Sequence, residues 1–403
     1  MAPSLVKFDA LRDNGRMNLE FDVVIVGGGL AGLSLAVALG TGRLSVAVVE
    51  GRVPAAVVGW DTRIYAVSPA NARFLDEIGI WQHFDASRLA AVEAMEIYGD
   101  AGGRLDFSAY DSGVDELAWI IEASLIQREL WETAKRQGNV SLFCPARPQA
   151  LSFAPDRATL NLDDGRNLNA RLIVAADGAD SWVRQSAGIE VEFKPYQQMG
   201  VVANFICQEP HRNKAFQWFR GDGVLAYLPL AESNMISIVW STADDHAAEL
   251  LALPPEEFSS RVAWAGEQRL GDLTLLAPAA GFPLRLMRAP RTVAPRLALI
   301  GDAAHAIHPL SGHGINLGFQ DARVLAETLT RRPDFVDCGD ERWLRRYERA
   351  RSEEVLALQS ATHGLQRLFL PQNAALSMLR NAGLNLTNAL PVVRDALVRY
   401  ALG

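Results

Sequence analysis

One glycine-rich segment near the amino terminus restricts the possible folds more than any other feature of the chain. The β-branched run Val23–Val26 ends at consecutive glycines, and the apolar stretch Leu30–Leu39 follows them. Such a run is typical of a buried strand in a parallel sheet, and the stretch after it is typical of a buried helix. The segment therefore predicts a strand, a tight turn and a helix in close contact.

The glycines of this turn have the spacing Gly27-x-Gly29-x-x-Gly32. Gly27 permits a sharp turn, Gly29 lets the backbone approach a pyrophosphate, and Gly32 lets the helix and the strand pack closely. The N–H groups at the start of the helix, beside Leu30 and Ala31, have no partner within the helix and attract an anion. On its own, this spacing is a weak signal for a dinucleotide site.

A second predicted strand strengthens that signal. The apolar run at Ser45–Val49 ends at Glu50, roughly 20 residues after Gly27. A carboxylate at this position can accept hydrogen bonds from both hydroxyls of an adenosine ribose. The turn and the carboxylate together predict a dinucleotide site, and the alternative is a glycine-rich turn with a solvated glutamate.

The segment from Val23 to Gly42 contains no charge and is long enough to span a membrane. Its three consecutive glycines each destabilise a helix by about 1 kcal/mol relative to alanine, and no basic region of a signal peptide precedes them. The three cysteines of the chain form no C-x-x-C pair, which favours free thiols in a reducing compartment. We therefore expect a cytoplasmic protein.

Length and charge limit the function classes. With 403 residues, 49% of them hydrophobic, the chain can form two or three domains around sizeable cores. Its formal net charge of -8 provides no overall positive field for a phosphate backbone. We expect no nucleic-acid partner.

Two further predicted strands end in short polar turns. Asp177-Gly178 follows the strand Leu172–Ala176, and Gly301-Asp302 follows the strand Arg296–Ile300. The carboxyl ends of parallel strands meet at one edge of a sheet, where turns of this kind present groups to a ligand. Both turns are therefore candidates for the same site as Glu50.

A loop rich in glycine and proline follows Asp302 and leads into a helix predicted from about Leu317 to Thr330. Three histidines of this loop, His305, His308 and His313, suggest a metal site as one interpretation. Glycine and proline separate them, and no nearby acidic residue completes a ligand shell. We predict no metal and expect these side chains to make structural or polar contacts.

Two more side chains are candidates for the dinucleotide site. Asp61-Thr62-Arg63 places a cation where the chain can return toward a pyrophosphate. Gln127 lies near the start of a helix predicted from Leu125 to Gln137, where it can contact a ligand or form a capping box with Ser124. The sequence leaves both interpretations of Gln127 open.

The pattern changes in the middle of the chain, where spaced strands without intervening helices are predicted at Gly200–Cys207, Ala215–Arg220, Val224–Leu230 and Met235–Ser241. This pattern is typical of an antiparallel sheet inserted into an α/β domain as a substrate layer. Helix is predicted again between Asp244 and Leu270.

We therefore predict an α/β fold with three parts. A discontinuous Rossmann-like domain consists of residues 21–80, 120–185 and 285–330. Residues 81–119 and 186–284 form an inserted antiparallel-sheet substrate domain, and residues 331–403 form a C-terminal helical region.

The order of the motifs carries a resemblance to a known family. The motifs are Gly27-x-Gly29-x-x-Gly32 with Glu50, Asp61-x-Arg63, Ala176-Asp177-Gly178, and Gly301-Asp302-Ala303-Ala304-His305 with Pro309, Gly312, Gly314 and Asn316. In this order they resemble the class A flavoprotein aromatic monooxygenases, whose fold is p-hydroxybenzoate hydroxylase-like. Through residues 61–81, 118–130 and 301–322 the chain is most similar to the ubiquinone-biosynthesis hydroxylases, and the likeness spans about residues 21–365.

The resemblance implies that FAD binds at the N-terminal glycines and that NAD(P)H is a transient reductant. It implies that Glu50 holds the adenosine ribose, Arg63 the pyrophosphate side, Gln127 the ribityl region and Asp302 the ribityl chain or the pyrophosphate. The turn at Asp177-Gly178 is shared between FAD and NAD(P)H in this family. The other implied cofactor contacts are Gly27, Gly29, Leu30, Ala31, Gly32, Gly301, Pro309, Gly312, Gly314, Ile315 and Asn316, and the last part, Gly312–Asn316, lies along the isoalloxazine.

The implied reaction is hydroxylation of the aromatic ring of a polyprenylated phenol in ubiquinone biosynthesis. In this family NAD(P)H reduces FAD, O2 adds to give a C4a-hydroperoxyflavin, and the phenol attacks its distal oxygen. Because the flavin carries these steps, we name no catalytic acid or base. Ala123 and His313 stand where the ubiquinone hydroxylases usually have Asn and Gln, and these departures concern the ring contacts and the choice of substrate.

Two other classes of protein share most of these motifs. One is a flavin oxidoreductase without oxygen insertion, such as a polyprenyl reductase. The other is a non-catalytic FAD-holding assembly protein, which the missing acid–base pair also fits.

The carboxyl-terminal residues 361–403 carry four arginines and one aspartate among apolar runs. Basic amphipathic helices of this kind can lie on an anionic membrane, which suits a polyprenylated substrate. The alternative is a helix docked on the protein itself or on another protein of ubiquinone synthesis. The sequence thus predicts a cytoplasmic protein with peripheral contact to the inner face of the membrane as one option.

Overall fold

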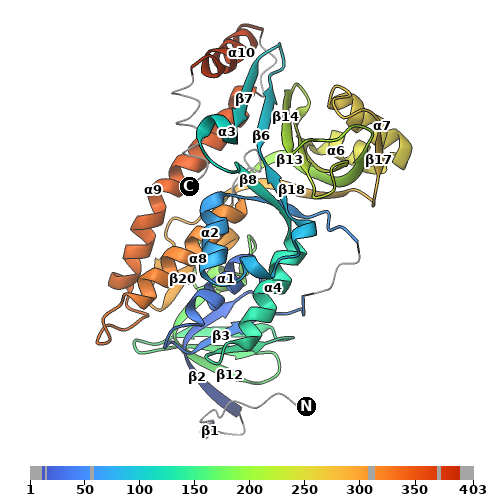
Figure 1. Ribbon diagram of the computed structural model, residues 1–403. Helices are drawn as coiled ribbons and strands as arrows, with labels where there is room; N and C mark the ends of the chain where they lie inside the picture. The colour runs from blue at the N-terminus through green and yellow to red at the C-terminus, as the bar shows by residue number, and fades with distance from the viewer. Residues whose placement is uncertain (1–10, 14–15, 55–58, 307–313, 370–373, 391–403) are drawn as a thin grey trace.

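The structure is a computed structural model that describes residues 11–13, 16–54, 59–306, 314–369 and 374–390. Its lower half in Figure 1 is built on a parallel sheet with the strand order β20, β12, β2, β3, β9. The bounds of these strands are β20 (Leu297–Leu299), β12 (Asn167–Ala175), β2 (Arg16–Val26), β3 (Val46–Val49) and β9 (Val140–Phe143). Antiparallel strands extend this sheet: β1 (Leu11–Asp13), β10 (Pro148–Phe153), β11 (Ala158–Leu162) and β19 (Val293–Ala294).

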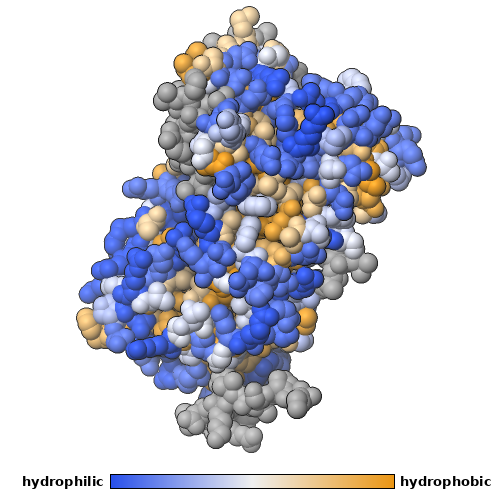
Figure 2. All heavy atoms as spheres, viewed as in Figure 1, coloured by the Kyte–Doolittle hydropathy of each residue, from blue (hydrophilic) through white to orange (hydrophobic). Residues whose placement is uncertain are grey.

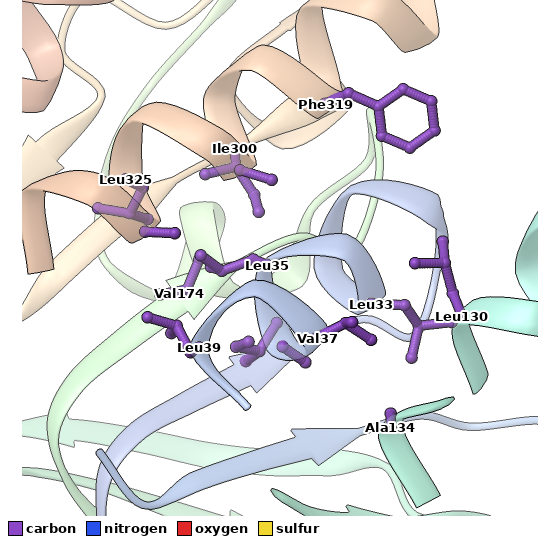
Figure 3. Close-up of a cluster of buried hydrophobic side chains, with 14 of the residues drawn as sticks. Leu33, Leu35, Val37, Leu39, Leu130, Ala134, Val174, Ile300, Phe319 and Leu325 are labelled. Atoms are coloured by element: carbon purple, nitrogen blue, oxygen red, sulfur yellow. The ribbon is translucent and has the colours of Figure 1, made fainter. Parts of the chain in front are cut away.

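Helices cover one face of the parallel sheet. They are α1 (Leu30–Leu39), α2 (Pro69–Glu77), α4 (Ala123–Arg136) and α8 (Gly314–Thr330). Helix α1 is apolar on all sides because it lies between the sheet, α4 and α8. Figure 3 shows this core, with side chains of α1 between those of the sheet and of the two neighbouring helices. Each fully buried leucine there contributes about 2 kcal/mol to stability.

A second sheet, largely antiparallel, forms the upper half of Figure 1. Its strand order is β21 (His305–Ala306), β18 (Ala280–Arg288), β13 (Glu192–Cys207), β16 (Met235–Ala243), β15 (Gly223–Pro229), β14 (Lys214–Arg220), β6 (Ala94–Tyr98) and β7 (Arg104–Ser108), with β17 (Leu273–Leu275) beside β13. Helices α6 (Asp244–Ala252) and α7 (Pro255–Ala265) pack against it around buried Trp240, Phe205 and Phe258.

Smaller elements join the two halves. A short sheet has the order β4 (Ile64–Val67), β8 (Ala118–Glu122), β5 (Ala90–Val92), and single turns of 3-10 helix lie at Trp81–His83, Ala86–Arg88 and Gly301–Ala303. The short helices are α3 (Ala109–Ser112) and α5 (Trp182–Ser186). Helix α9 (Glu341–Phe369) runs along one side of the molecule and leads to α10 (Ala374–Asn388), which lies beside β7 (Figure 1).

The predicted fold class, a Rossmann-like α/β unit with an antiparallel sheet and C-terminal helices, is confirmed. The helix predicted from Leu317 includes Gly314, Ile315 and Asn316 as well. The boundaries between the predicted domains stay a prediction. Strand β18 crosses the predicted boundary between residues 284 and 285. Strand β21 belongs to the second sheet, where it pairs with β18, although the prediction assigned its residues to the Rossmann-like part.

Helix α10 is docked on the protein itself, as one of the two alternatives for the C-terminal region predicts. Asn381, Asn385 and Asn388 accept hydrogen bonds from backbone amides of the β6–β7 hairpin, which forms an edge of the second sheet. An ion pair joins Arg380 to Asp100 in the turn of that hairpin. The polar face of α10 therefore docks on the chain's own sheet edge. Among the helices that the structure describes, none has the length and apolar character needed to cross a membrane.

Candidate active site

The strands of the parallel sheet end at a common edge. Val26 of β2 lies opposite Val49 of β3 on one side and Ala175 of β12 on the other, and Ala175 lies opposite Leu299 of β20. The residues that follow these strands are therefore brought together although they are far apart in the sequence. A cavity of about 850 Å³ opens at this edge.

Most of the predicted cofactor-binding residues line this cavity. They are Gly27, Gly29, Leu30, Ala31, Glu50, Arg63, Gln127, Asp177, Gly178, Gly301, Asp302, Gly314 and Ile315. Gly32 and Asn316 do not line it and have the packing roles described below. Pro309 and Gly312 lie outside the described residues, as do His308 and His313. The assignment of each residue to a part of the cofactor stays a prediction.

The glycine turn has the geometry that a close approach of phosphate requires. Gly27 has a φ of 114°, which favours glycine. A Cβ at Gly32 would lie 2.1 Å from the carbonyl oxygen of Gly27, so a side chain there would separate the helix from the strand. An ideal Cβ at Gly29, in contrast, meets no heavy atom within 4 Å. The turn thus leaves an open space in front of the N-terminus of α1, where an anion fits.

Glu50 and Gln127 hold this turn from two sides. The Glu50 carboxylate accepts a hydrogen bond from the Gly28 amide at 2.6 Å and another from the Arg52 amide at 3.0 Å. The Gln127 amide donates to the Gly28 carbonyl oxygen at 2.8 Å. The capping-box interpretation of Gln127 is therefore wrong, because its side chain reaches the glycine turn rather than Ser124.

Asp61 caps α4 in place of the predicted Ser124. Its carboxylate accepts hydrogen bonds from the amides of Ser124 at 3.1 Å and Arg63 at 2.9 Å. The Asp61 amide donates to Glu122 at 2.6 Å, and Glu122 forms an ion pair with Arg88 at 2.6 Å. This network sets the backbone from which Arg63 faces the cavity. The sequence does not predict this network, because no local pattern brings residues 61 and 122 together.

The turn after β12 is built around Asp177. Burial raises the pKa of its carboxyl, and hydrogen bonds from Ser181 and from the Val183 amide oppose the shift. Gly178 has a φ of 85°, so the chain can turn sharply here. Asp180 of the same turn forms an ion pair with Arg285 of β18 at 2.7 Å. The second sheet therefore contacts this turn at the cavity, and Phe282, Pro283 and Leu284 of β18 continue the cavity wall.

Asp302 and His305 line the cavity on the side of β20. Desolvation by the surrounding protein raises the pKa of Asp302, and the nearby charges of His305 and Arg63 partly oppose it. His305 is buried and its Nε2 lies 2.7 Å from the carboxylate of Asp321. The prediction of a polar contact for this histidine is confirmed.

Asn316 fixes the start of α8 rather than facing the cavity. Its side-chain oxygen accepts hydrogen bonds from the Ser68 amide at 2.9 Å and the Asn71 side chain at 3.0 Å, and its nitrogen donates to the Ala66 carbonyl at 2.8 Å. These contacts join α8 to β4 and α2. They leave Gly314 and Ile315, in the first turn of α8, on the cavity wall.

No group of three or more histidine, cysteine or acidic side chains is placed to hold a metal within the part of the chain that the structure describes. The site instead combines a glycine turn, a helix N-terminus, a carboxylate at each of three strand ends, and a partly apolar wall from the second sheet. This combination suits an elongated, anionic, partly aromatic ligand such as a dinucleotide.

Comparison with known proteins gives a consistent result. The FAD binding domain family model matches residues 20–361. The chain is 34% identical to ubiquinone hydroxylase UbiL of Rhodospirillum rubrum, over 95% of this chain and 89% of the relative, and 32% identical to 3-demethoxyubiquinol 3-hydroxylase of Escherichia coli, over 96% and 99%. The crystal structure of PqsL of Pseudomonas aeruginosa in complex with 2-aminobenzoylacetate is similar with a TM-score of 0.76 at 26% identity, covering 91% of this chain and 99% of that one.

Proposed function

The chain belongs to the FAD-dependent monooxygenases of the FAD binding domain family, and on this premise we propose that it hydroxylates the aromatic ring of a polyprenylated phenol in ubiquinone biosynthesis, using NAD(P)H and O2. The observation that carries the proposal is the cavity in which the glycine turn and Asp302 face the β18 wall. The curated relatives named for ubiquinone hydroxylation match nearly the whole chain, which supports the choice of substrate class.

The residues of the cavity fit FAD. The open space at Gly29 and the N-terminus of α1 would receive the pyrophosphate, with Arg63 beside it. Glu50 would accept hydrogen bonds from the adenosine ribose, and Gln127 and Asp302 would bind the ribityl chain. Gly314 and Ile315 would lie along the isoalloxazine, and Asp177-Gly178 would serve both FAD and NAD(P)H. Bound FAD supplies the hydride acceptor and the activation of O2.

The protein's own part is to position the ring and to exclude water. Phe282, Pro283 and Leu284 give the cavity an apolar wall on the side of the second sheet. An ideal Cβ on Gly200 of β13 would lie 2.7 Å from the ring of Phe282, so this ring rests directly on the glycine backbone. An apolar wall would help to exclude water and to orient a phenol ring against the cofactor.

A turnover experiment tests the proposal. The purified protein should show visible flavin absorption that NAD(P)H bleaches and O2 restores. With a short-chain prenylated phenol, the product should be heavier by one oxygen atom. A product heavier by two hydrogen atoms would instead indicate a reductase, and flavin that NAD(P)H never reduces in the presence of the phenol would indicate a non-catalytic protein.

We further propose that α10 contacts a membrane surface through its exposed apolar side chains, as a peripheral protein on the inner face of the membrane would. Met378 and Leu386 of α10 have 74% and 62% of their surface exposed, and Leu390 follows close to the helix end. Figure 2 shows apolar side chains at this upper end of the molecule. Because α10 is docked through its asparagines, these exposed apolar side chains are held at the surface of the protein. A polyprenylated substrate would be taken from the same membrane.

Vesicle binding tests this surface. Replacing Met378 and Leu386 by serine should strongly reduce co-sedimentation with vesicles that contain anionic lipid, because the apolar area that enters the bilayer is lost. Phe335→Ser is a matched control, since Phe335 is 91% exposed and lies far from α10 in the sequence. Equal binding of the double variant and the wild type would refute this surface, and the flavin spectrum shows that each variant is folded.

A further inference from the structure

A buried network of charges lies behind the cavity wall. Asp321 of α8 is fully buried, and His305 of β21 and Arg351 of α9 are each 4% exposed. The Asp321 carboxylate contacts His305 Nε2 at 2.7 Å with one oxygen and accepts a hydrogen bond from Arg351 Nε at 2.8 Å with the other. Buried charges of this kind are stable only when they are paired and hydrogen-bonded. The network therefore has a defined arrangement.

The same carboxylate also fixes the turn that carries Asp302. The oxygen that contacts His305 accepts a second hydrogen bond, from the Gly301 amide at 2.9 Å. Gly301 has a φ of 57°, and an ideal Cβ there would lie 3.1 Å from Ala31 of α1. Asp321 thus sets the orientation of two residues that line the cavity, Asp302 and His305, although it does not line the cavity itself.

Arg351 holds Asp321 from the C-terminal region. Its guanidinium donates to the Gln320 side-chain oxygen at 3.1 Å and forms an ion pair with Glu354. Each of its three nitrogens therefore has a partner. Further along α9, the Gln359 amide donates to the Met287 carbonyl at 3.1 Å, at the pairing of β18 with β21. The same amide lies 3.5 Å from the Ala306 carbonyl, so α9 contacts the cavity-lining segment 301–306 directly at Ala306 and indirectly through Asp321.

We propose that Arg351 is a positioning residue for the cofactor: acting through Asp321, it holds His305 and the Gly301-Asp302 turn in the orientation that faces FAD. The inference rests on the proposed function in that the ligand of the cavity is FAD. It makes α9 part of the active site, although no atom of Arg351 lines the cavity. Without the guanidinium, one oxygen of a fully buried carboxylate loses its charged partner, and the carboxylate must draw on His305 and the Gly301 amide instead.

Charges around His305 support the same arrangement. The groups that face it are Asp321 from α8, Arg351 from α9 and Asp302 from the preceding turn. Desolvation lowers the pKa of His305, but the contact with Asp321 outweighs it, so the net pKa is raised. The pKa of Asp321 is lowered, because its contacts with His305 and Arg351 outweigh desolvation. Asp321 therefore favours the protonated form of the His305 imidazole at the cavity wall.

The test is FAD binding by the full-length protein, with no phenol or nicotinamide present. We expect Arg351→Met to raise the dissociation constant of FAD about tenfold or more, and Arg351→Lys to recover most of the affinity because it restores a charged donor to Asp321. Arg349→Met is the matched control, since Arg349 is exposed on the same helix and loses the same charge. Thermal unfolding of each apoprotein separates loss of stability from loss of affinity.

A pH profile adds a result that a purely structural role does not predict. In Asp321→Asn the imidazole of His305 loses its anion, so its pKa is lower than in the wild type and the pH dependence of FAD affinity shifts to lower pH. An unchanged dissociation constant in Arg351→Met would overturn the inference, as would a lower unfolding temperature with unchanged affinity. If Arg351→Met does not fold, Arg351→Gln carries the same test with the same refuting result. Failure of the wild type to bind FAD would refute the proposed function instead.

Discussion

The docking of α10 on the β6–β7 hairpin makes a quantitative prediction. The side chain of Asn381 is almost fully buried at this contact. Its oxygen accepts from the amides of Ala101 at 3.2 Å and Gly103 at 2.8 Å, and its nitrogen donates to Asp100 at 2.8 Å and to the Ser377 carbonyl at 2.7 Å. Replacing Asn381 by alanine removes the three hydrogen bonds to the hairpin and leaves a cavity in the contact.

The expected loss follows from the number of bonds. At about 1 kcal/mol net for each of the three bonds that cross the contact, the docked state loses about 3 kcal/mol relative to the undocked state. That value corresponds to a roughly hundredfold larger population of undocked α10. An ideal Cβ on Gly99 or Gly103 would lie within 2.5 Å of the Asn381 oxygen. These glycines leave room for the Asn381 side chain. Alanine at position 381 is too short to fill that room and has no polar atom to replace the lost hydrogen bonds.

Hydrogen exchange measures this population directly. In Asn381→Ala, amides of α10 and the edge amides of Arg104 and Asp106 should exchange about a hundred times faster, while those of β2 and β12 keep their protection. Met378→Ala is the control, because the Met378 side chain is exposed on the same helix. Equal protection of α10 in Asn381→Ala and in the control would refute the docking argument.

Three further predictions concern the cofactor turn, acid stability and metals. Gly29→Val should give a folded but colourless protein, because a branched side chain fills the open space for the pyrophosphate; visible flavin absorption at full occupancy would show that this turn does not bind FAD. Although burial raises the pKa of Glu96, its contacts with Tyr98, Lys214 and Arg269 hold that pKa at about 2 instead of 4.5. The ionised carboxylate thus contributes about 3 kcal/mol of stability above pH 4.5, and this contribution is lost as the pH falls toward 2. In urea unfolding, the difference in free energy between the wild type and Glu96→Gln should therefore shrink between about pH 5 and about pH 3, and a constant difference would contradict this origin. Chelators should leave activity unchanged; activity that EDTA removes and a divalent ion restores would overturn the prediction that no metal is bound.

The sequence predicts well the cavity residues that follow the parallel strands, and the reason is physical. Gly27, Glu50, Asp177 and Asp302 each follow directly after an apolar strand, and parallel strands bring their carboxyl ends to one edge. A local pattern of a few residues is therefore enough to place these groups together. The identity of the ligand as FAD came from the resemblance in motif order, since the glycine spacing alone is shared by other dinucleotide-binding proteins.

The contacts that support the site from behind the cavity wall could not be predicted in this way. Arg351 reaches Asp321 only because α9 packs against α8, and Asp61 caps α4 from a loop about 60 residues earlier. Gln127 has the spacing of a capping box, yet its side chain reaches the Gly28 carbonyl because α1 and α4 lie side by side. These contacts depend on tertiary packing, which leaves no periodic pattern in the sequence. The asparagines of α10 are a further case, because their partners are amides of a distant sheet edge.

The origin of the oxygen in the product tests the central claim most directly. The FAD-loaded protein is given NAD(P)H and a prenylated phenol, once under oxygen-18 gas in ordinary water and once under ordinary oxygen in labelled water. A monooxygenase predicts one labelled oxygen atom on the aromatic ring in the first reaction and none in the second. A ring oxygen that comes from water, or a product that gains hydrogen without oxygen, would contradict the account.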